Sequence, residues 1–264
     1  MLPISSLRSL LTALCLLACS GSAFAHLSYS GRNFGTFTGL ELQSNTIAGQ
    51  TVPTNWGWAD GTDGDFGHSH RVRFFRFTLE NTATVTLTFT SLDPTAMLPA
   101  FSLYSGLAHS SPPDYENAIT YQYLSTLPGA AKEGAFNALA TWKMGNDASQ
   151  TYDDFSTFSY VGNGADGGSG NYGNTAGING DGVADGTVTG TFVLPAGSYT
   201  VGVGGANYSG QGAGAPTTEG ANEGADGTAD ALTSSIAVVP EPTATLLGLS
   251  GVILMALRRR RRRA

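Results

Sequence analysis

Apolar and polar residues alternate along much of the chain with the period of two that is typical of a half-buried β-strand. Residues 84–90 are the clearest case, because Val85, Leu87 and Phe89 alternate with four threonines. Each such strand would bury its apolar face and leave its threonine face in water. Further strands are predicted at 75–79, 101–103, 188–194, 199–203 and 236–238.

Short connections rich in turn-forming residues separate these strands. Residues 80–83 are predicted to form a turn, and Pro195-Ala196-Gly197 is predicted to close a hairpin between 188–194 and 199–203. Strands with one buried and one wet face favour an all-β fold. We therefore predict an antiparallel β-sandwich with long Gly-rich loops for residues 26–239, with an insertion or long crossover at 105–160 that holds one short helix around Ala135 to Lys143.

The C-terminal end has three parts in a fixed order. Val239-Pro240-Glu241-Pro242 precedes an uncharged run at 243–257, and this run precedes six arginines: Arg258, Arg259, Arg260, Arg261, Arg262 and Arg263. A helix over 243–257 would span roughly 22 Å, which reaches across a bilayer where arginines snorkel and the bilayer thins. The positive-inside rule keeps the arginines cytoplasmic. Residues 240–264 are thus predicted to be a stop-transfer anchor.

The N-terminal end has the three parts of a secretory signal peptide. Arg8 precedes an apolar stretch at 10–18, and small residues lead to Ala23-Phe24-Ala25. Cleavage by signal peptidase after Ala25 would remove residues 1–25. The alternative is lipidation of Cys19, since residues 16–19 have the form of a lipoprotein box. Cleavage after Ala25 removes both cysteines and leaves the exported chain without a thiol.

The C-terminal tail resembles the PEP-CTERM sorting tail on the strength of Val239-Pro240-Glu241-Pro242, the short apolar run and the arginine cluster. The resemblance implies recognition by exosortase in a Gram-negative bacterium that exports polysaccharide. It implies a precursor held transiently in the inner membrane, and then a mature form at the cell surface or outside the cell. On the apolar run alone, an ordinary membrane-anchored protein remains the alternative.

Parts of the body resemble bacterial pre-peptidase C-terminal domains. The residues that carry this likeness are 73–79, 91–94, 100–104 and 194–201, and residues 105–160 depart from it. The resemblance implies a small jelly-roll-like sandwich appended to a secreted protein.

Charge excludes one large class of partner. Residues 26–239 hold six basic and 19 acidic residues, a formal charge of −13. Binding to nucleic acid depends on Lys and Arg that displace counterions from phosphates. We therefore expect no nucleic-acid partner.

Two groups of oxygen-bearing side chains are candidates for calcium. Asp60, Asp63 and Asp65 lie within six residues, and a second group surrounds glycines further along the chain, at Asn179, Asp181 and Asp185. Neither completes a calcium-loop motif, and Asp-Gly pairs also form ordinary turns. His68 and His70 could join Asp65 at a metal, but spacing places no third ligand, which favours a solvated pair.

Trp56 and Trp58 alternate in a Gly- and Asp-rich context. They could form a sugar-stacking platform, and packing in the core is the alternative. No catalytic spacing is present, so we predict that the protein is not an enzyme. The preferred function is structural or adhesive in an extracellular polysaccharide matrix. A secreted carbohydrate-binding module and a secreted hydrolase with an unrecognised site are the alternatives.

Overall fold

The computed structural model describes seven stretches of the chain: residues 27–59, 66–69, 71–107, 135–144, 156–172, 176–207 and 229–241. The predicted signal peptide and the apolar run at 243–257 lie outside these stretches. Within them, no helix is both long and apolar enough to cross a membrane.

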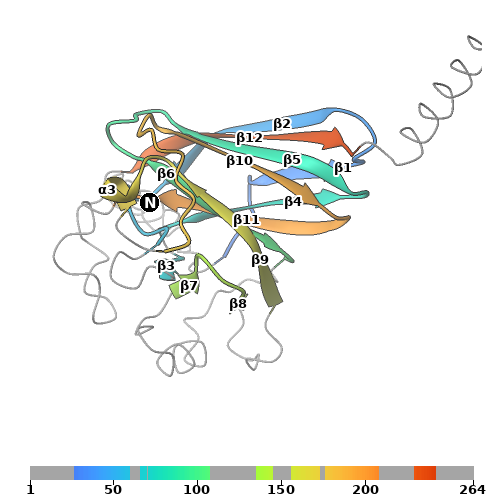
Figure 1. Cartoon of the computed structure of the whole chain (residues 1–264), viewed down its shortest axis with the longest axis horizontal. Helices are drawn as coiled ribbons and strands as arrows, with labels where there is room; N and C mark the ends of the chain where they lie inside the picture. Colours follow the sequence, from blue (N-terminus) through green and yellow to red (C-terminus); the bar gives the residue numbers. More distant parts are fainter. Residues whose placement is uncertain are drawn as a thin grey trace, which may run out of the picture.

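Two sheets lie in layers one above the other (Figure 1). The upper sheet in this view has four antiparallel strands in the order β10-β5-β12-β2. The lower sheet has six strands in the order β1-β4-β11-β6-β9-β8, and among these only β1 and β4 pair in parallel. The prediction of an all-β sandwich is therefore confirmed.

The bounds of these elements follow the chain. The four-stranded sheet contains β2 (Gln43–Val52), β5 (Ala83–Ser91), β10 (Thr187–Leu194) and β12 (Asp230–Pro240). The six-stranded sheet contains β1 (Asn33–Phe37), β4 (Arg73–Leu79), β6 (Pro99–Ser105), β8 (Trp142–Met144), β9 (Ser156–Ala165) and β11 (Gly197–Gly205). A small ribbon is formed by β3 (Phe66–His68) and β7 (Ala135–Asn137), and the short helix α3 spans Ser169–Tyr172.

The main core lies between the two sheets. Strand β5 alternates strictly between buried and half-buried residues, so Val85, Leu87 and Phe89 face inward. They meet aromatic side chains from the other layer: the ring centroid of Phe89 lies 5.8 Å from that of Phe75 and 5.2 Å from that of Phe101. Burial of these large side chains supplies most of the driving force for folding.

A second core covers the opposite face of the six-stranded sheet. Strand β6 is buried at six of its seven positions, because its two faces are both covered. This second cluster includes Leu27, Tyr29, Trp58, Val72, Phe74, Ala100, Tyr104, Ala138, Trp142 and Phe158. The sandwich is therefore two sheets with an additional covering layer, in which Leu27, Tyr29, Trp58 and Ala138 pack against the six-stranded sheet.

Close packing explains one of the glycines within β9. A Cβ atom at Gly164 would lie 2.7 Å from Cε1 of Phe101 and 3.1 Å from Cγ2 of Val188. Only a residue without a side chain lets β9 approach these two core residues. The high glycine content of the second half of the chain thus includes positions inside the sheet as well as loops.

Two local expectations are wrong. The turn at 195–196 does not close a hairpin, because β10 pairs with β5 whereas β11 pairs with β4 and β6. The short helix expected at 135–143 is replaced by β7, a bend and β8. Asn137 accounts for the bend, since its Oδ1 accepts a hydrogen bond from the backbone N–H of Leu139 at 3.0 Å, an arrangement that competes with a helix.

Candidate functional site

The predicted sorting motif begins at the end of the last strand. Strand β12 runs between β5 and β2, and its final residue, Pro240, pairs with Ala83 of β5. Proline has no N–H to donate, so the ladder stops there. The side chain of Val239 is 45% exposed. Pro242 lies outside the described residues.

The carboxylate of Glu241 is attached to the sandwich. Its Oε1 accepts a hydrogen bond from Oγ1 of Thr84, the second residue of β5. Thr84 lies on the outer face of the four-stranded sheet, between Val193 of β10 and Val239 of β12. The acid of the motif is therefore held by a folded strand. The sequence gives no local signal for this contact, because the two residues are far apart in the chain.

The N-terminal end of the described fold is also firmly packed. Leu27 and Tyr29 are buried, and the hydroxyl groups of Tyr29 and Thr200 lie 2.7 Å apart. Arg32 donates hydrogen bonds to the carbonyl oxygen atoms of Phe74 and Ser28. Burial lowers the pKa of Arg32 to about 10, with a smaller contribution from the charge of Arg73. Ala23 and Ala25 of the predicted cleavage site lie outside the described residues.

The second candidate calcium group is engaged in hydrogen bonds within the fold. Oδ1 of Asp181 accepts hydrogen bonds from the backbone N–H groups of Gly167 and Val183, at 2.9 and 3.1 Å. Oδ1 of Asp185 accepts from Thr187 N–H at 3.0 Å, and Asn179 donates its backbone N–H to the side chain of Asn163. The bonds from Val183 and Thr187 are those of ordinary turns, whereas the other two join this loop to β9 and to the bend that follows it.

A buried acid that the sequence analysis missed lies beneath this loop. The carboxylate of Asp166 accepts hydrogen bonds from the N–H groups of Asp185 and Gly186, at 3.0 and 2.7 Å. Burial raises its pKa to about 6, and the negative charges of Asp181 and Asp185 add to this rise. Across the described stretches, no three His, Cys, Asp or Glu side chains come together as metal ligands would.

The other candidate calcium group, Asp60, Asp63 and Asp65, lies outside the described residues. His68 is the last residue of β3, and its backbone pairs with that of Ala135 in β7. A metal near this ribbon stays a prediction.

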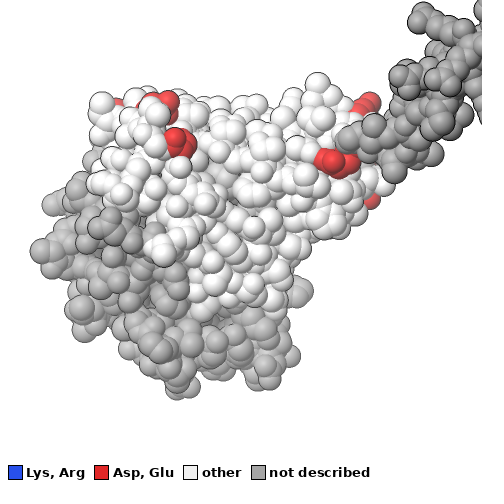
Figure 2. Space-filling model, viewed as in Figure 1, with Lys and Arg blue, Asp and Glu red and all other residues white. Residues whose placement is uncertain are grey.

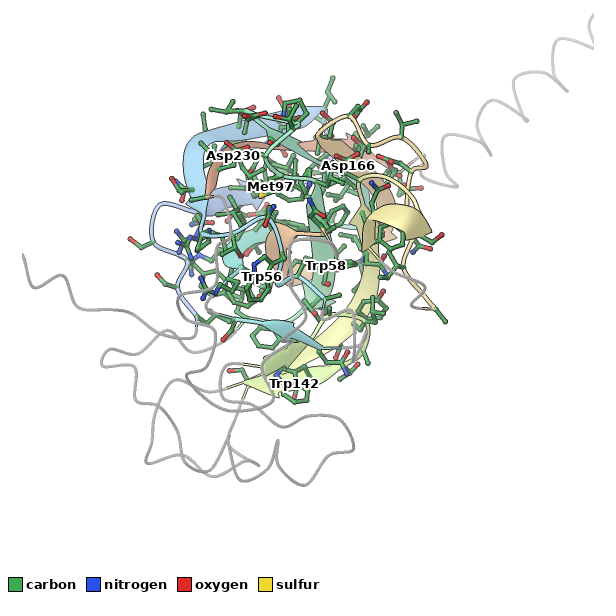
Figure 3. All side chains as sticks on the ribbon, turned by 90° about the vertical axis from the view of Figure 1, so that its left-hand side faces the viewer. Trp56, Trp58, Met97, Trp142, Asp166 and Asp230 are labelled. Carbon is green, nitrogen blue, oxygen red and sulfur yellow. The ribbon has the colours of Figure 1, made fainter. Side chains whose placement is uncertain are left out.

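Both candidate tryptophans are buried rather than open to solvent. Trp58 is fully buried and donates from Nε1 to Oγ of Ser102 at 2.8 Å. Trp56 is 4% exposed, and the guanidinium carbon of Arg71 lies 5.3 Å from its ring centroid. Figure 3 shows both rings inside the ribbon. Neither ring offers a free face to a sugar, which agrees with core packing and leaves the stacking platform without geometric support.

Charged side chains are scarce on the four-stranded sheet. Its four strands contain no Lys or Arg, and Asp230 is their only acid. The described part of the face in Figure 2 likewise shows a few acidic side chains and no basic ones. Threonines form rows on the outer surface instead: Thr86 is hydrogen-bonded to Thr191, and Thr88 to Thr189, each at 3.0 Å.

No protein-family model matches the chain, and no curated protein matches it. Among solved structures, a surface-associated copper-binding protein of Methylomicrobium album BG8, CorA, has a TM-score of 0.49 and 16% identity, and the match covers 80% of this chain and 98% of that one. The secreted protein MopE of Methylococcus capsulatus, in which an oxidized tryptophan facilitates copper binding, has a TM-score of 0.37 and 17% identity, with 83% and 92% covered. Neither similarity identifies a family for this chain.

Proposed function

We propose that this protein is exported from a Gram-negative bacterium and sorted through its C-terminal tail. Signal peptidase removes residues 1–25, and the run at 243–257 holds the precursor in the inner membrane. Exosortase then processes the chain at Val239-Pro240-Glu241-Pro242. The mature protein is displayed on, or released into, an extracellular polysaccharide matrix, where its function is structural or adhesive.

One observation carries this proposal: the folded sandwich fills the interval between the two predicted sorting signals. Its first described residue, the buried Leu27, follows Ala25 by two positions, and its last strand ends at Pro240, inside the tail motif. Removal of residues 1–25 and of the segment beyond Glu241 would leave every strand of the sandwich in place.

The outer face of the four-stranded sheet supports contact with a neutral polymer. Each bonded threonine pair on β5 and β10 uses one hydroxyl proton between its two members and keeps one proton and free lone pairs for a partner. Around these pairs the strands carry no charged side chain, and Glu241 lies at the end of the face, against Thr84. Its regular rows of hydroxyl and methyl groups suit a hydroxyl-rich polysaccharide.

The test of sorting uses the acid of the motif. In cells that contain exosortase, we expect Glu241→Ala to accumulate as an unprocessed form in the inner membrane, with little protein at the surface. Glu80→Ala is the matched control, because Glu80 is an exposed acid at the same end of the sandwich. Equal surface yields for Glu241→Ala and the parent protein would contradict the proposal.

A further inference from the structure

Exposed aliphatic side chains gather at one end of the sandwich. Leu40 and Leu42 are 70% and 73% exposed, and Val193 and Val239 are 64% and 45% exposed. Single exposed aliphatic residues are common on protein surfaces. These four differ because they come from three separate parts of the chain and meet at the same edge.

The strand register shows that they are neighbours. Thr84 of β5 pairs with Val193 on one side and with Val239 on the other. On the next strand, the pair between Val238 and Gln43 brings the adjoining residue, Leu42, beside Val239. Side chains of Val193, Thr84, Val239 and Leu42 thus form a row on the outer face, across β10, β5, β12 and the residue that precedes β2. We call this row, together with Leu40, the apolar rim.

The turn that carries Leu40 is fixed in place. Gln43 Oε1 accepts hydrogen bonds from the backbone N–H and the hydroxyl of Thr38, at 2.7 and 2.9 Å, and Oγ1 of Thr38 accepts from Leu40 N–H at 3.3 Å. A Cβ at Gly39 would lie 2.9 Å from the carbonyl oxygen of Asn81. The exposed leucines therefore project from an ordered turn, and their exposure is a property of the fold.

The chain leaves the sandwich at this same end. Glu241 is bonded to Thr84 within the apolar rim, and only Pro242 separates Glu241 from the uncharged run that starts at Thr243. Two extended residues span about 7 Å. A membrane that holds the run at 243–257 must therefore lie close to the rim.

We propose that the apolar rim rests on the periplasmic surface of the inner membrane in the precursor. This inference rests on the membrane-held precursor of the proposed function. Leu40 and Leu42 enter the interface between headgroups and acyl chains, where exposed leucines are stabilised. Val193 and Val239 lie at the level of the headgroups. The sandwich then stands on the bilayer on its tail end, with the loop around Val183 at the far end.

Charge indicates the kind of lipid that the rim contacts. Glu41, Glu80 and Glu241 are at this end, and the described residues 38–43, 80–84, 193–197 and 239–241 include no Lys or Arg. Figure 2 shows acidic side chains at the right-hand end, where β12 stops. Anionic headgroups would be repelled, so the rim fits a zwitterionic surface. A second copy of the chain is a poorer fit, because a stable interface buries about 1,200 Å² or more.

The test places a fluorophore at each end of the full chain. Cys15→Ser and Cys19→Ser remove the native thiols, and Leu40→Cys or Val183→Cys then carries an environment-sensitive label; Val183 is 60% exposed at the opposite end. Each protein is reconstituted into phosphatidylethanolamine–phosphatidylcholine vesicles that contain a doxyl-labelled lipid. We expect a blue-shifted emission at 40 and quenching about threefold stronger or more than at 183.

Each other outcome overturns the inference in a distinct way. Equal, weak quenching at both positions in protein that floats with the vesicles contradicts the rim contact and leaves the membrane anchor intact. Protein that does not float with the vesicles contradicts the anchor and the rim together. If the blue shift at position 40 grows with protein concentration and the emission is not quenched by the doxyl-labelled lipid, the rim contacts a second copy of the chain instead of the membrane.

Discussion

The hydroxyl of Thr84 donates a hydrogen bond to the carboxylate of Glu241, which lies 157 positions later in the chain. This contact joins the second residue of β5 to the acid of the predicted processing motif. The motif is therefore docked on the sandwich, and a protease that binds it in an extended form must first detach Glu241.

Loss of the Thr84 hydroxyl is expected to speed processing. In Thr84→Val, Glu241 has no donor on β5, so the detached form costs less free energy by the net value of about one hydrogen bond. We predict a roughly two- to tenfold faster loss of precursor in a pulse-chase experiment. Thr86→Val is the control, because the hydroxyl of Thr86 bonds Thr191 instead. Equal rates for the two variants would rule out a restraining contact.

The buried carboxyl of Asp166 predicts a specific pH dependence of stability. Its folded pKa, about 6, lies above its ordinary value of 3.8, so the folded state binds the proton more tightly than the unfolded state. Ionisation of this group therefore destabilises the fold as pH rises between these two values.

We expect the free energy of unfolding of the parent protein, relative to Asp166→Asn, to fall by up to about 3 kcal/mol between roughly pH 4 and pH 7. Urea unfolding at a series of pH values measures this difference. Asp185→Asn should narrow this pH dependence, because the charge of Asp185 contributes to the raised pKa of Asp166. A difference that does not vary with pH would contradict the raised pKa of Asp166.

Trp58 is predicted to contribute strongly to the stability of the fold. Truncation to Ala leaves a large cavity beside the six-stranded sheet and leaves Ser102 without its indole donor. We expect Trp58→Ala to lower the free energy of unfolding by about 3–5 kcal/mol, measured by thermal or urea unfolding. Leu92→Ala, at a 65% exposed position, should change it by no more than about 0.5 kcal/mol. Unchanged stability in Trp58→Ala would contradict its place in the core.

Calcium at Asp60, Asp63 and Asp65 is a prediction from the sequence that thermal unfolding can test. A ligand that binds only the folded state stabilises it by about 2.7 kcal/mol at 100 times its dissociation constant. We expect calcium to raise the melting temperature and a chelator to lower it, with both effects lost in Asp63→Ala.

Copper(II) is the contrasting arm of this titration, because imidazole groups suit that ion better than calcium. Stabilisation by copper alone, lost when His68 and His70 are both changed to Ala, would contradict the calcium prediction and assign the metal to the histidines. An unchanged melting temperature with both ions would contradict metal-dependent stability of this protein.

The sequence was sufficient to locate β4, β5, β6, β10, β11 and β12, but it did not locate β1, β2 or β9 and did not pair any of the strands. Val85, Leu87 and Phe89 alternate with threonine, and this period reports directly which face of β5 is buried. The partner of a strand leaves no such mark. The turns at 80–82 and 195–196 have the composition of hairpin turns, yet each carries the chain from one sheet to the other. A hairpin turn and a connection between the two sheets have the same local composition, because both need a tight reversal of the chain.

The candidate site was predicted in part for a similar reason. Pro240 and Glu241 stand out because they are consecutive, whereas Thr84 is one of many threonines until β5 and β12 pair. Leu40, Leu42 and Val193 become neighbours only through the same pairing. The burial of Trp56 and Trp58 depends on the second core over the six-stranded sheet, and the alternation of two aromatic residues does not reveal which face is covered.

Mass spectrometry of both termini of the natural extracellular form tests directly whether both sorting signals are removed. We predict a chain that begins at His26 and ends within or next to residues 239–242, without the apolar run and the arginines. A mature surface form that still ends in Arg263 and Ala264, or that begins before residue 26, would contradict it.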